Sequence, residues 1–416
     1  MKSIPKPILW TIDAMILLYC VSVYVFSFDE SMNIYSKLLA ACLIALLVLY
    51  TVLKQRITVD VFSVLLVLFV VYSFLSVFWT INAESTISKC LTLLQIGILS
   101  LLLYNYLALE HKLNFFVAVL CVAGIVFAAY TVLYFGIDEY FDILNSGERV
   151  GAEITNVNAI GVICSLTAVM LLWYILYRKM FVAVLPLALC VLVSLATGSR
   201  KALLAIFIGV VCLFILKGNV KQKLFYLLLC IVALILLYNV LQLPAFSLLT
   251  KRIERMFETF DTGARIDNST YLRMRMIAEG WAQFKKTPIL GIGLDNAQVV
   301  NVSVVGYNLY LHNNYIELLV SLGLVGTVIY YAMYLVPLKA LAVSAVKSNR
   351  DAVLACTLIA VQLVLHFAMV AYYDKMTYMY IIIFFLTLQK QRVNRIEKTA
   401  HQGADSSCAC PSGTAH

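Results

Sequence analysis

The sequence predicts an all-α polytopic membrane protein with about twelve transmembrane helices and one large loop outside the cytoplasm. Of the 416 residues, 63% are hydrophobic and only 13% are charged, which is too apolar for a water-soluble domain of this size. Apolar runs long enough to cross the ~30 Å hydrocarbon core as helices recur along almost the whole chain. Lysine and arginine are concentrated in every second connection between these runs, as in proteins that cross a membrane many times.

Each expected span is an apolar run between polar connections. The runs lie near residues 8–27, 37–53, 61–79, 90–108, 113–135, 157–177, 180–197, 202–217, 222–243, 314–337, 351–372 and 377–389. The chain then divides into residues 1–243 with the first nine spans, an outer loop at 244–313, residues 314–390 with the last three spans, and a polar tail at 391–416. The even number of spans places both termini on one side, and the tail is expected to be disordered.

The basic residues orient the bundle. Those that share one face precede the first span, occupy alternate loops and continue into the tail: Lys2, Lys6, Lys54, Arg56, Lys112, Arg178, Lys179, Lys217, Lys221, Lys223, Lys339, Lys347, Arg350, Lys390, Arg392, Arg395 and Lys398. Short cytoplasmic loops carry such an excess, so this face is predicted to be cytoplasmic. The formal net charge of +9 therefore indicates topology and contact with anionic lipids, and nucleic acid is not an expected partner.

The outer loop is too long to be structureless, so we expect it to fold. Residues 246–260 place their apolar side chains on one helical stripe: Phe246, Leu249, Ile253, Met256, Phe257 and Phe260. This pattern predicts an amphipathic helix on the outer leaflet. A second helix is predicted at 269–286, with Asn268 or Ser269 as its N-cap. The turn 288–293, which begins with a proline and contains two glycines, ends that helix and permits close backbone approach.

Unusual polar residues gather at the outer ends of the helices. They are Arg149, Asn156, Asn158, Arg200, Lys201, Arg273 and His312. Polar groups near the hydrocarbon are costly, and this set would suit an anionic ligand embedded in the outer leaflet. Arg200 and Lys201 form a cationic pair that opposes the positive-inside bias. The guanidinium of Arg200 could bind a phosphate as a bidentate donor, or it could pair with a lipid headgroup or Glu153.

The second loop helix contains two arginines. Arg275 lies four residues before Glu279, so the two can form a surface pair. Arg273 has no acidic neighbour at helical spacing and is the better candidate for a ligand contact.

His312 lies directly before the apolar run 314–337. It could be an interface or capping histidine, but a helix N-terminus disfavours the imidazolium form, so the ring is expected to be neutral and able to take a proton near pH 7. The same N-terminus could offer free backbone N–H groups to an anion. Asn313 could cap the helix, and Glu317 could orient Asn313 or a substrate hydroxyl. His111 and His366 are interpreted as structural.

The sequence indicates no metal and no cofactor. The eleven cysteines lie in expected spans, at their edges or in the tail, which favours neither disulfides nor zinc. Asp138, Glu139 and Asp142 form an acidic patch on the outer face, but no Asp-x-Asp pair accompanies them.

From about Gly147 to Tyr331 the sequence resembles the superfamily of O-antigen ligases and O-antigen and capsule polysaccharide polymerases. The motifs that carry the resemblance are the segment 156–161, the Thr-Gly-Ser-Arg-Lys-Ala-Leu-Leu run at 197–204, Arg273 before the turn 288–293, and His312-Asn313 followed by Gly-Leu-Val-Gly at 323–326. The resemblance implies a GT-C-like, all-helical membrane glycosyltransferase that inverts the anomeric centre without a metal. Its donor would be an undecaprenyl-diphosphate-linked glycan, used at the outer face of the bacterial inner membrane.

Carried over by position, the resemblance implies that Arg200 and Arg273 bind the donor diphosphate and that His312 helps to activate the acceptor hydroxyl. The family often has a tryptophan four residues after the loop arginine; here that position is Ile277, and Trp281 follows one turn later, so Arg275 remains an alternative to Arg273. The substrate-binding candidates are Arg149, Asn158, Lys201, Arg275, Asn313 and Glu317.

The acceptor would be another lipid-linked glycan for a polymerase or a lipid A core for a ligase, and the 197–204 and 312–319 contexts favour a polymerase. Membrane lipids and a chain-length regulator are further candidate partners. A transporter or flippase is the alternative from another class, although the chain shows no repeated halves and no polar site at the midplane.

Overall fold

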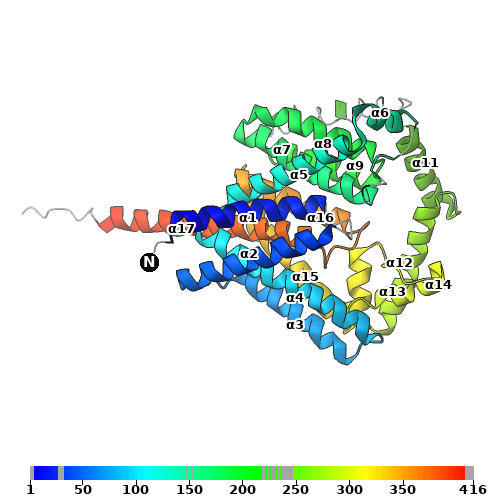
Figure 1. Cartoon of the computed structure of the whole chain (residues 1–416), viewed down its shortest axis with the longest axis horizontal. Coiled ribbons are helices and arrows are strands. Elements are labelled where there is room, and N and C mark those ends of the chain that lie inside the picture. The colour runs from blue at the N-terminus through cyan, green and yellow to red at the C-terminus, as the bar shows by residue number, and fades with distance from the viewer. Residues whose placement is uncertain are drawn as a thin grey trace, which may run out of the picture.

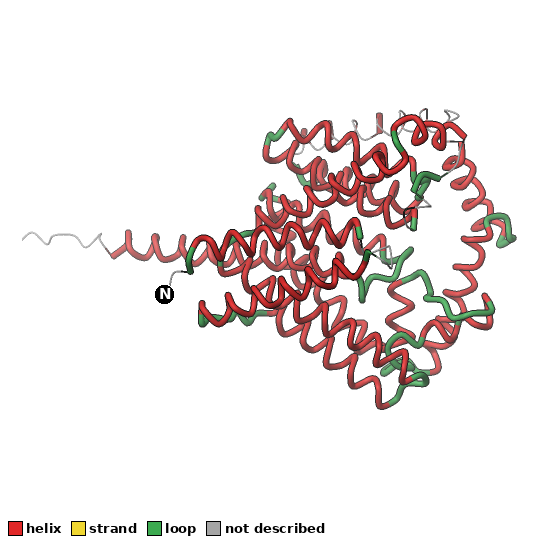
Figure 2. The backbone as a smooth tube through the Cα atoms, in the orientation of Figure 1, coloured by secondary structure: helices red, strands yellow, loops and turns green. Residues whose placement is uncertain are grey.

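The structure is a computed structural model that describes residues 4–26, 32–146, 149–151, 154, 156–217 and 247–407, together with scattered positions between 221 and 239. Every element in the part of the chain that it describes is a helix, which confirms the predicted all-α class. Most helices run side by side in one bundle, and α11 and α12 cross one end of it (Figure 1). The tube view shows loops among helices and no strand over the described ranges (Figure 2).

The bundle helices and the connecting helices have the following bounds. In chain order they are α1 (Lys6–Val25), α2 (Asn33–Lys54), α3 (Val61–Leu75), η1 (Ser76–Phe78), α4 (Ala83–Leu109), α5 (Leu113–Phe135), α6 (Ile137–Ser146), α7 (Val157–Arg178), η2 (Phe181–Ala183), α8 (Val184–Ala196), α9 (Arg200–Ile215), α11 (Ser247–Thr262), α12 (Asn268–Lys286), α13 (Ala297–Val300), α14 (Val302–Val305), α15 (Asn314–Val346), α16 (Arg350–Leu365) and α17 (Lys375–Ser407).

Seven helices in the described ranges are long and apolar enough to cross a membrane, against about twelve expected from the sequence. They are Lys6–Val25, Asn33–Lys54, Val61–Phe78, Ala83–Leu109, Leu113–Phe135, Val157–Arg178 and Asn314–Val346. The expected spans at 180–197, 202–217 and 351–372 form the shorter helices α8, α9 and α16, of 13, 16 and 16 residues. The expected span at 222–243 lies mostly outside the described residues.

Several helix bounds differ from the predicted spans because of local capping and polarity. α4 begins at Ala83 rather than at residue 90, since the Asn82 side chain accepts a hydrogen bond from the Ser85 N–H at 3.2 Å. α17 continues past residue 390 to Ser407, into the segment expected to be disordered, since its lysines, arginines and glutamines favour helix.

One end of the bundle collects the basic loops that were predicted to share a face. Arg178 and Lys390 both pair with Asp351, at 2.9 and 2.7 Å. Lys54 pairs with Glu110 at 2.6 Å at the ends of α2 and α4. Basic residues from distant loops therefore meet at one end, opposite to α11 and α12 (Figure 1).

α15 was predicted as one continuous span, but it is broken at Gly323, where φ is 63° and ψ is −165°. The turn 288–293 fits against this break. The Ile292 and Gly293 N–H groups donate to the carbonyls of Val320 and Ser321, each at 2.9 Å, and the Leu324 N–H donates to the Pro288 carbonyl at 2.9 Å. The predicted close backbone approach is confirmed, and it satisfies the polar groups that the broken helix leaves unpaired.

Candidate functional site

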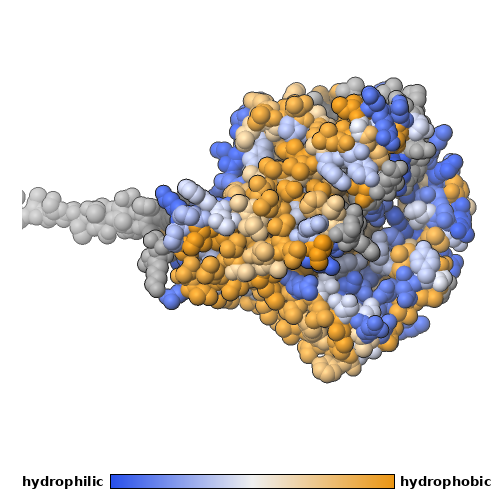
Figure 3. Space-filling model, viewed as in Figure 1, coloured by the Kyte–Doolittle hydropathy of each residue, from blue (hydrophilic) through white to orange (hydrophobic). Residues whose placement is uncertain are grey.

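A cavity of about 450 Å³ lies between the bundle and the crossing helices α11 and α12. Its polar lining consists of Asn158, Arg200, Lys201, Thr270, Arg273 and His312. Its apolar lining consists mainly of Leu203, Leu204 and Phe207 from α9, Ile253, Met256, Phe257 and Phe260 from α11, and Met274 and Ile277 from α12. In the space-filling view, apolar residues cover much of the flank of the bundle, whereas polar ones gather towards the end that carries α11 to α14 (Figure 3).

Helix α11 supplies its predicted apolar stripe to this cavity. Met256 and Phe257 lie three and four residues after Ile253, and Phe260 lies four and three residues after them, so all four share one face of the helix. That face is turned towards the cavity, whose opposite wall includes apolar residues of α9. Of the predicted stripe, Phe246 lies outside the described residues.

Arg200 begins α9 and reaches across to the start of α12. Its Nη1 donates to Asp267 Oδ2 at 2.8 Å, with both side chains mostly buried. Asp267, and not Asn268 or Ser269, is the N-cap of α12; its carboxylate also accepts from the Thr270 N–H at 3.2 Å and from the Thr270 hydroxyl. Burial raises the pKa of Asp267, but the hydrogen bonds from Thr270 and Arg200 outweigh burial and hold that pKa below its ordinary value.

The rotation of α12 separates its two arginines. The cavity is lined by one face of α12, which carries Thr270, Arg273, Met274 and Ile277 at helical spacing. Arg275 is not among the lining residues; it pairs with Glu279 at 3.9 Å on the exposed side, as the four-residue spacing predicts. The structure therefore brings Arg273 to the cavity and leaves Arg275 outside it.

His312 lies in the loop before α15, in the left-handed region with a φ of 55°. Its ring lies 4.2 Å from the ring of Tyr310, measured between centroids. Burial, and then the positive charges of Arg273 and Lys201, lower the pKa of His312 to about 3. The ring is neutral, as predicted, but burial and two cations cause this. The same causes make it a weaker base than the expected one, which would take a proton near pH 7.

The first turn of α15 is fully occupied by hydrogen bonds, so it does not offer the free N–H groups expected for an anion. Asn313 is the N-cap, and its side-chain oxygen accepts from the N–H groups of Tyr315 and Ile316 at 3.0 and 3.1 Å. The Asn314 N–H donates to the His366 carbonyl at 2.8 Å, and the Glu317 N–H donates to the Asn313 carbonyl at 3.0 Å. The predicted capping role of Asn313 is confirmed, and Asn313 is buried.

Two polar residues of the cavity lining, Asn158 and Lys201, are held by hydrogen bonds to their neighbours. The Asn158 side-chain oxygen accepts from Arg149 Nη2 and from the Ser199 hydroxyl, both at 3.1 Å. Arg149 Nε also donates to the Thr197 carbonyl at 2.8 Å, which ties the loop before α7 to the loop before α9. Lys201 Nζ donates to the Ala368 carbonyl at 3.1 Å. Asn158 and Lys201 line the cavity, whereas Arg149 supports Asn158 from behind.

Glu317 does not reach the cavity. It is fully buried, and its Oε2 accepts from the Leu311 N–H at 2.7 Å. The face of α15 that carries it packs into the protein, so it fastens the loop that holds His312 rather than orienting a substrate.

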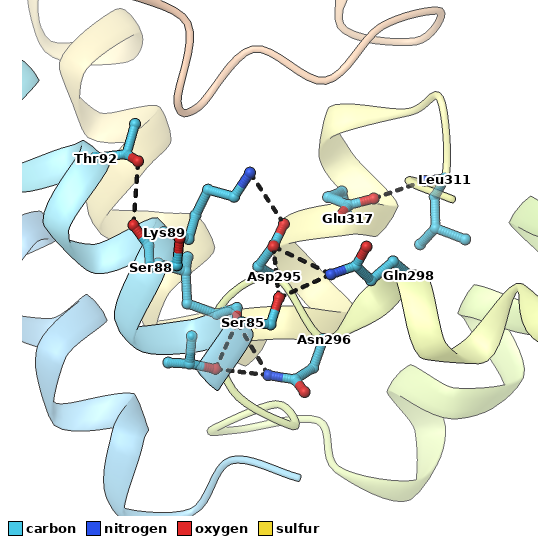
Figure 4. A network of polar contacts seen from close by, with 11 residues as sticks. Ser85, Ser88, Lys89, Thr92, Asp295, Asn296, Gln298, Leu311 and Glu317 are labelled. Carbon is cyan, nitrogen blue, oxygen red and sulfur yellow. Dashed lines mark hydrogen bonds and ion pairs between the residues drawn. The ribbon is translucent and has the colours of Figure 1, made fainter. Parts of the chain in front are cut away.

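A polar network stands beside this loop (Figure 4). Lys89 of α4 pairs with Asp295 at 3.5 Å, and Asp295 accepts from the Ser85 hydroxyl at 2.8 Å and from Gln298 Nε2 at 3.2 Å. Lys89 Nζ also lies 3.8 Å from the centre of the Tyr373 ring. The network therefore connects α4, the segment before α13 and the loop before α17.

Three polar residues of the site were not predicted from the sequence: Asp267, Thr270 and Tyr310. Asp267 is a good capping type directly before a polar Asn-Ser-Thr segment, and that signal could have identified it. Tyr310 has no local signal, because only the fold places its ring against His312. Asp138, Glu139 and Asp142 lie on α6 and are not among the residues that line the cavity.

Residues 185–331 match the family model described as O-antigen ligase. This match includes α9, α11, α12 and the first half of α15, and it confirms the resemblance to the O-antigen ligase and polymerase superfamily. No curated protein matches the chain.

Proposed function

We infer from the O-antigen ligase family domain at residues 185–331 that this protein is a membrane enzyme of the O-antigen ligase or polymerase type. We propose that it polymerises undecaprenyl-diphosphate-linked repeat units into O-antigen or capsular polysaccharide at the outer face of the inner membrane. The observation that carries the proposal is that one cavity holds the cations Arg200, Lys201 and Arg273, the neutral His312 and a long apolar wall.

The donor would occupy the cavity with its lipid and its diphosphate in different parts. The apolar wall made by α9 and α11 suits a polyprenyl chain, because burial of apolar groups there removes them from water. Arg273 and Arg200 suit the diphosphate, since a guanidinium can donate two parallel hydrogen bonds to phosphate oxygens. Asp267 accepts from Arg200 Nη1 at 2.8 Å and so fixes the position of the guanidinium at the cavity.

In the proposed reaction an acceptor hydroxyl attacks the anomeric carbon of the donor glycan. A new C–O bond forms to the acceptor oxygen, and the C–O bond to the diphosphate breaks, so the lipid diphosphate leaves with the electron pair. His312 takes the proton of the hydroxyl. Arg273, Arg200 and Lys201 stabilise the negative charge that develops on the leaving group, in a site with little water.

Donor binding also explains how His312 can act as a base. Burial, and then the charges of Arg273 and Lys201, lower the pKa of His312, and a bound diphosphate would neutralise these two charges. The pKa of His312 would then rise towards its ordinary value. Proton transfer would thus be favoured only after the donor is in place.

O-antigen ligation is the second candidate function, because the matching family model is described by that activity. The acceptor would then be a lipid A core, and the donor site would be the same. A deletion strain separates the two. A surface with single repeat units in place of polymer supports polymerisation, whereas intact lipid-linked polymer beside an unmodified core supports ligation.

The direct test uses purified protein and lipid-linked repeat unit. We expect elongation by the native protein and its loss in Arg200→Ala and His312→Ala variants that keep their thermal stability. Elongation that persists in both variants would contradict the proposed roles. Movement of the lipid-linked unit across vesicles with no new glycosidic bond would indicate a flippase instead.

A further inference from the structure

A second cavity of about 220 Å³ lies on the other side of His312. His312, Lys201 and Asn158 line both cavities. The rest of the second lining combines polar groups, from Asn156, Tyr310, Tyr373 and Asp374, with apolar ones, from Ala159, Val162, Ile163, Met369, Val370 and Met376. Of the two linings, only the second contains a carboxylate and phenol groups.

We propose that this second cavity binds the acceptor sugar, with Asp374 and Tyr373 as acceptor-binding residues. The inference rests on the proposed glycosyl transfer and deepens it. Sugar rings present hydroxyls, which carboxylates and amides bind, and a face of C–H groups, which packs on aromatic rings. Both kinds of partner line this cavity, and the imidazole of His312 stands between it and the proposed donor site.

Asp374 retains hydrogen-bonding capacity for a ligand. Its Oδ1 accepts from the Met376 N–H at 3.3 Å, its Oδ2 accepts from the Thr377 hydroxyl at 3.2 Å, and the Thr377 N–H is a third donor to this carboxylate. The first two hydrogen bonds are long, and a carboxylate can accept about four. A hydroxyl of the acceptor could therefore be added without the loss of any of these bonds.

Neighbouring side chains hold the two tyrosines in place: Lys89 contacts Tyr373, and His312 contacts Tyr310. Lys89 Nζ sits 3.8 Å from the centre of the Tyr373 ring, and Lys89 also pairs with Asp295 at 3.5 Å (Figure 4). The Tyr310 ring packs against the His312 ring. The aromatic surface is thus fixed before any ligand arrives, which reduces the entropy cost of binding.

The division between the cavities fits an inverting displacement. The acceptor oxygen and the leaving diphosphate must approach the anomeric carbon from opposite sides. Two cavities that meet at His312 and Lys201 provide separate places for them. His312 lines the acceptor cavity, so it can take the proton of the acceptor hydroxyl.

The test measures the acceptor KM separately from the donor KM. The acceptor probe is a repeat-unit oligosaccharide on a fluorescent aglycone, which lacks diphosphate and cannot serve as donor; lipid A core is the probe if the deletion strain indicates ligation. For Asp374→Asn we expect the acceptor KM to rise by about tenfold, the effect of losing a hydrogen bond to a charged group. The donor KM should stay unchanged.

Asp374→Asn is suited to this test because asparagine caps helices as well as aspartate does. Asp60→Asn is the matched control, since Asp60 also caps a helix, α3, but lines neither cavity. Met376→Trp, which narrows the cavity by another route, should also raise the acceptor KM.

An unchanged acceptor KM in both variants, or a rise in the donor KM alone, would overturn the assignment. A fall in kcat with both KM values unchanged would also overturn it, because that result indicates a structural role. These outcomes require a native protein that transfers glycan. A native protein that forms no glycosidic bond with either acceptor would instead contradict the proposed function.

Discussion

Arg273 and Arg275 are two residues apart in the sequence, but they face opposite environments. Arg273 lines the larger cavity and lowers the pKa of His312. Arg275 is 57% exposed and pairs with Glu279. Spacing alone favoured Arg273 only weakly, since the rotation of α12 about its axis depends on what the helix packs against.

This difference gives a matched pair of variants. Arg273→Gln should lower kcat by about 100-fold, because removal of one donor that stabilises transition-state charge has an effect of that size. Arg275→Gln should change kcat by about twofold at most, since an exposed ion pair contributes little. Initial rates of glycan transfer test both, and similar losses in the two variants would contradict the assignment.

The protonation of His312 can be measured directly. Because its pKa is about 3, the imidazole should stay neutral as the pH falls from 8 to 5. Arg273→Gln should raise the pKa, since it removes one of the charges that disfavour the imidazolium form, and saturating pyrophosphate should raise it in the native protein.

Nitrogen NMR of histidine-labelled protein follows this titration, since the chain has only five histidines. The spectrum of a His312→Asn variant identifies the signal. A midpoint near the ordinary value of about 6.5 in the ligand-free native protein would contradict the proposed environment.

At the scale of elements, Asp267 connects α9 to α12. Asp267→Asn should keep the cap and the thermal unfolding midpoint, whereas Asp267→Ala should lower stability by about 1 kcal/mol. Both should reduce transfer, because Arg200 loses the carboxylate that holds it at 2.8 Å. Thermal unfolding in detergent and initial rates separate the two effects. Full activity in Asp267→Asn would show that Asp267 acts only as a cap.

The break in α15 is a second feature at this scale. A Cβ on Gly323 would lie 2.2 Å from the Ile289 carbonyl oxygen, and one on Gly291 would lie 2.5 Å from the Ser321 carbonyl oxygen. Gly323→Ala should therefore greatly lower the thermal unfolding midpoint, because the new methyl group would push the backbone of the turn 288–293 away from α15 and break the packing between them.

Gly263→Ala is the control for this prediction. Gly263 has nearly the same φ, 66° against 63° for Gly323, but nothing lies within 4 Å of its added Cβ. It should lose only about 1 kcal/mol, the cost of the left-handed backbone. Equal losses for the two glycines would show that the backbone angle, and not the contact with the turn 288–293, controls this site.

At the scale of the whole molecule, the bundle has two distinct ends. α11 and α12 cross one end of the bundle (Figure 1), and residues near that end line both cavities. The other end carries the salt bridges of the basic loops. The positive-inside rule then predicts that the cavity end faces away from the cytoplasm.

Cysteine labelling tests this orientation. Ala264→Cys, in the exposed turn between α11 and α12, should react with a membrane-impermeant maleimide in intact spheroplasts. Lys347→Cys, exposed at the opposite end, should react only after lysis. The native chain supplies the background from its own cysteines. The reverse pattern would place the proposed site in the cytoplasm.

Composition and helical periodicity, which act over a few residues, are enough to predict the membrane class, the sorting of basic loops, the amphipathic stripe of α11 and the cations and histidine that line the larger cavity. Packing between distant helices is what lets Asp267 hold Arg200, buries Glu317, occupies the N–H groups in the first turn of α15 and brings two cavities together at His312. Such features depend on how helices far apart in the chain rotate and pack, and local periodicity does not specify that.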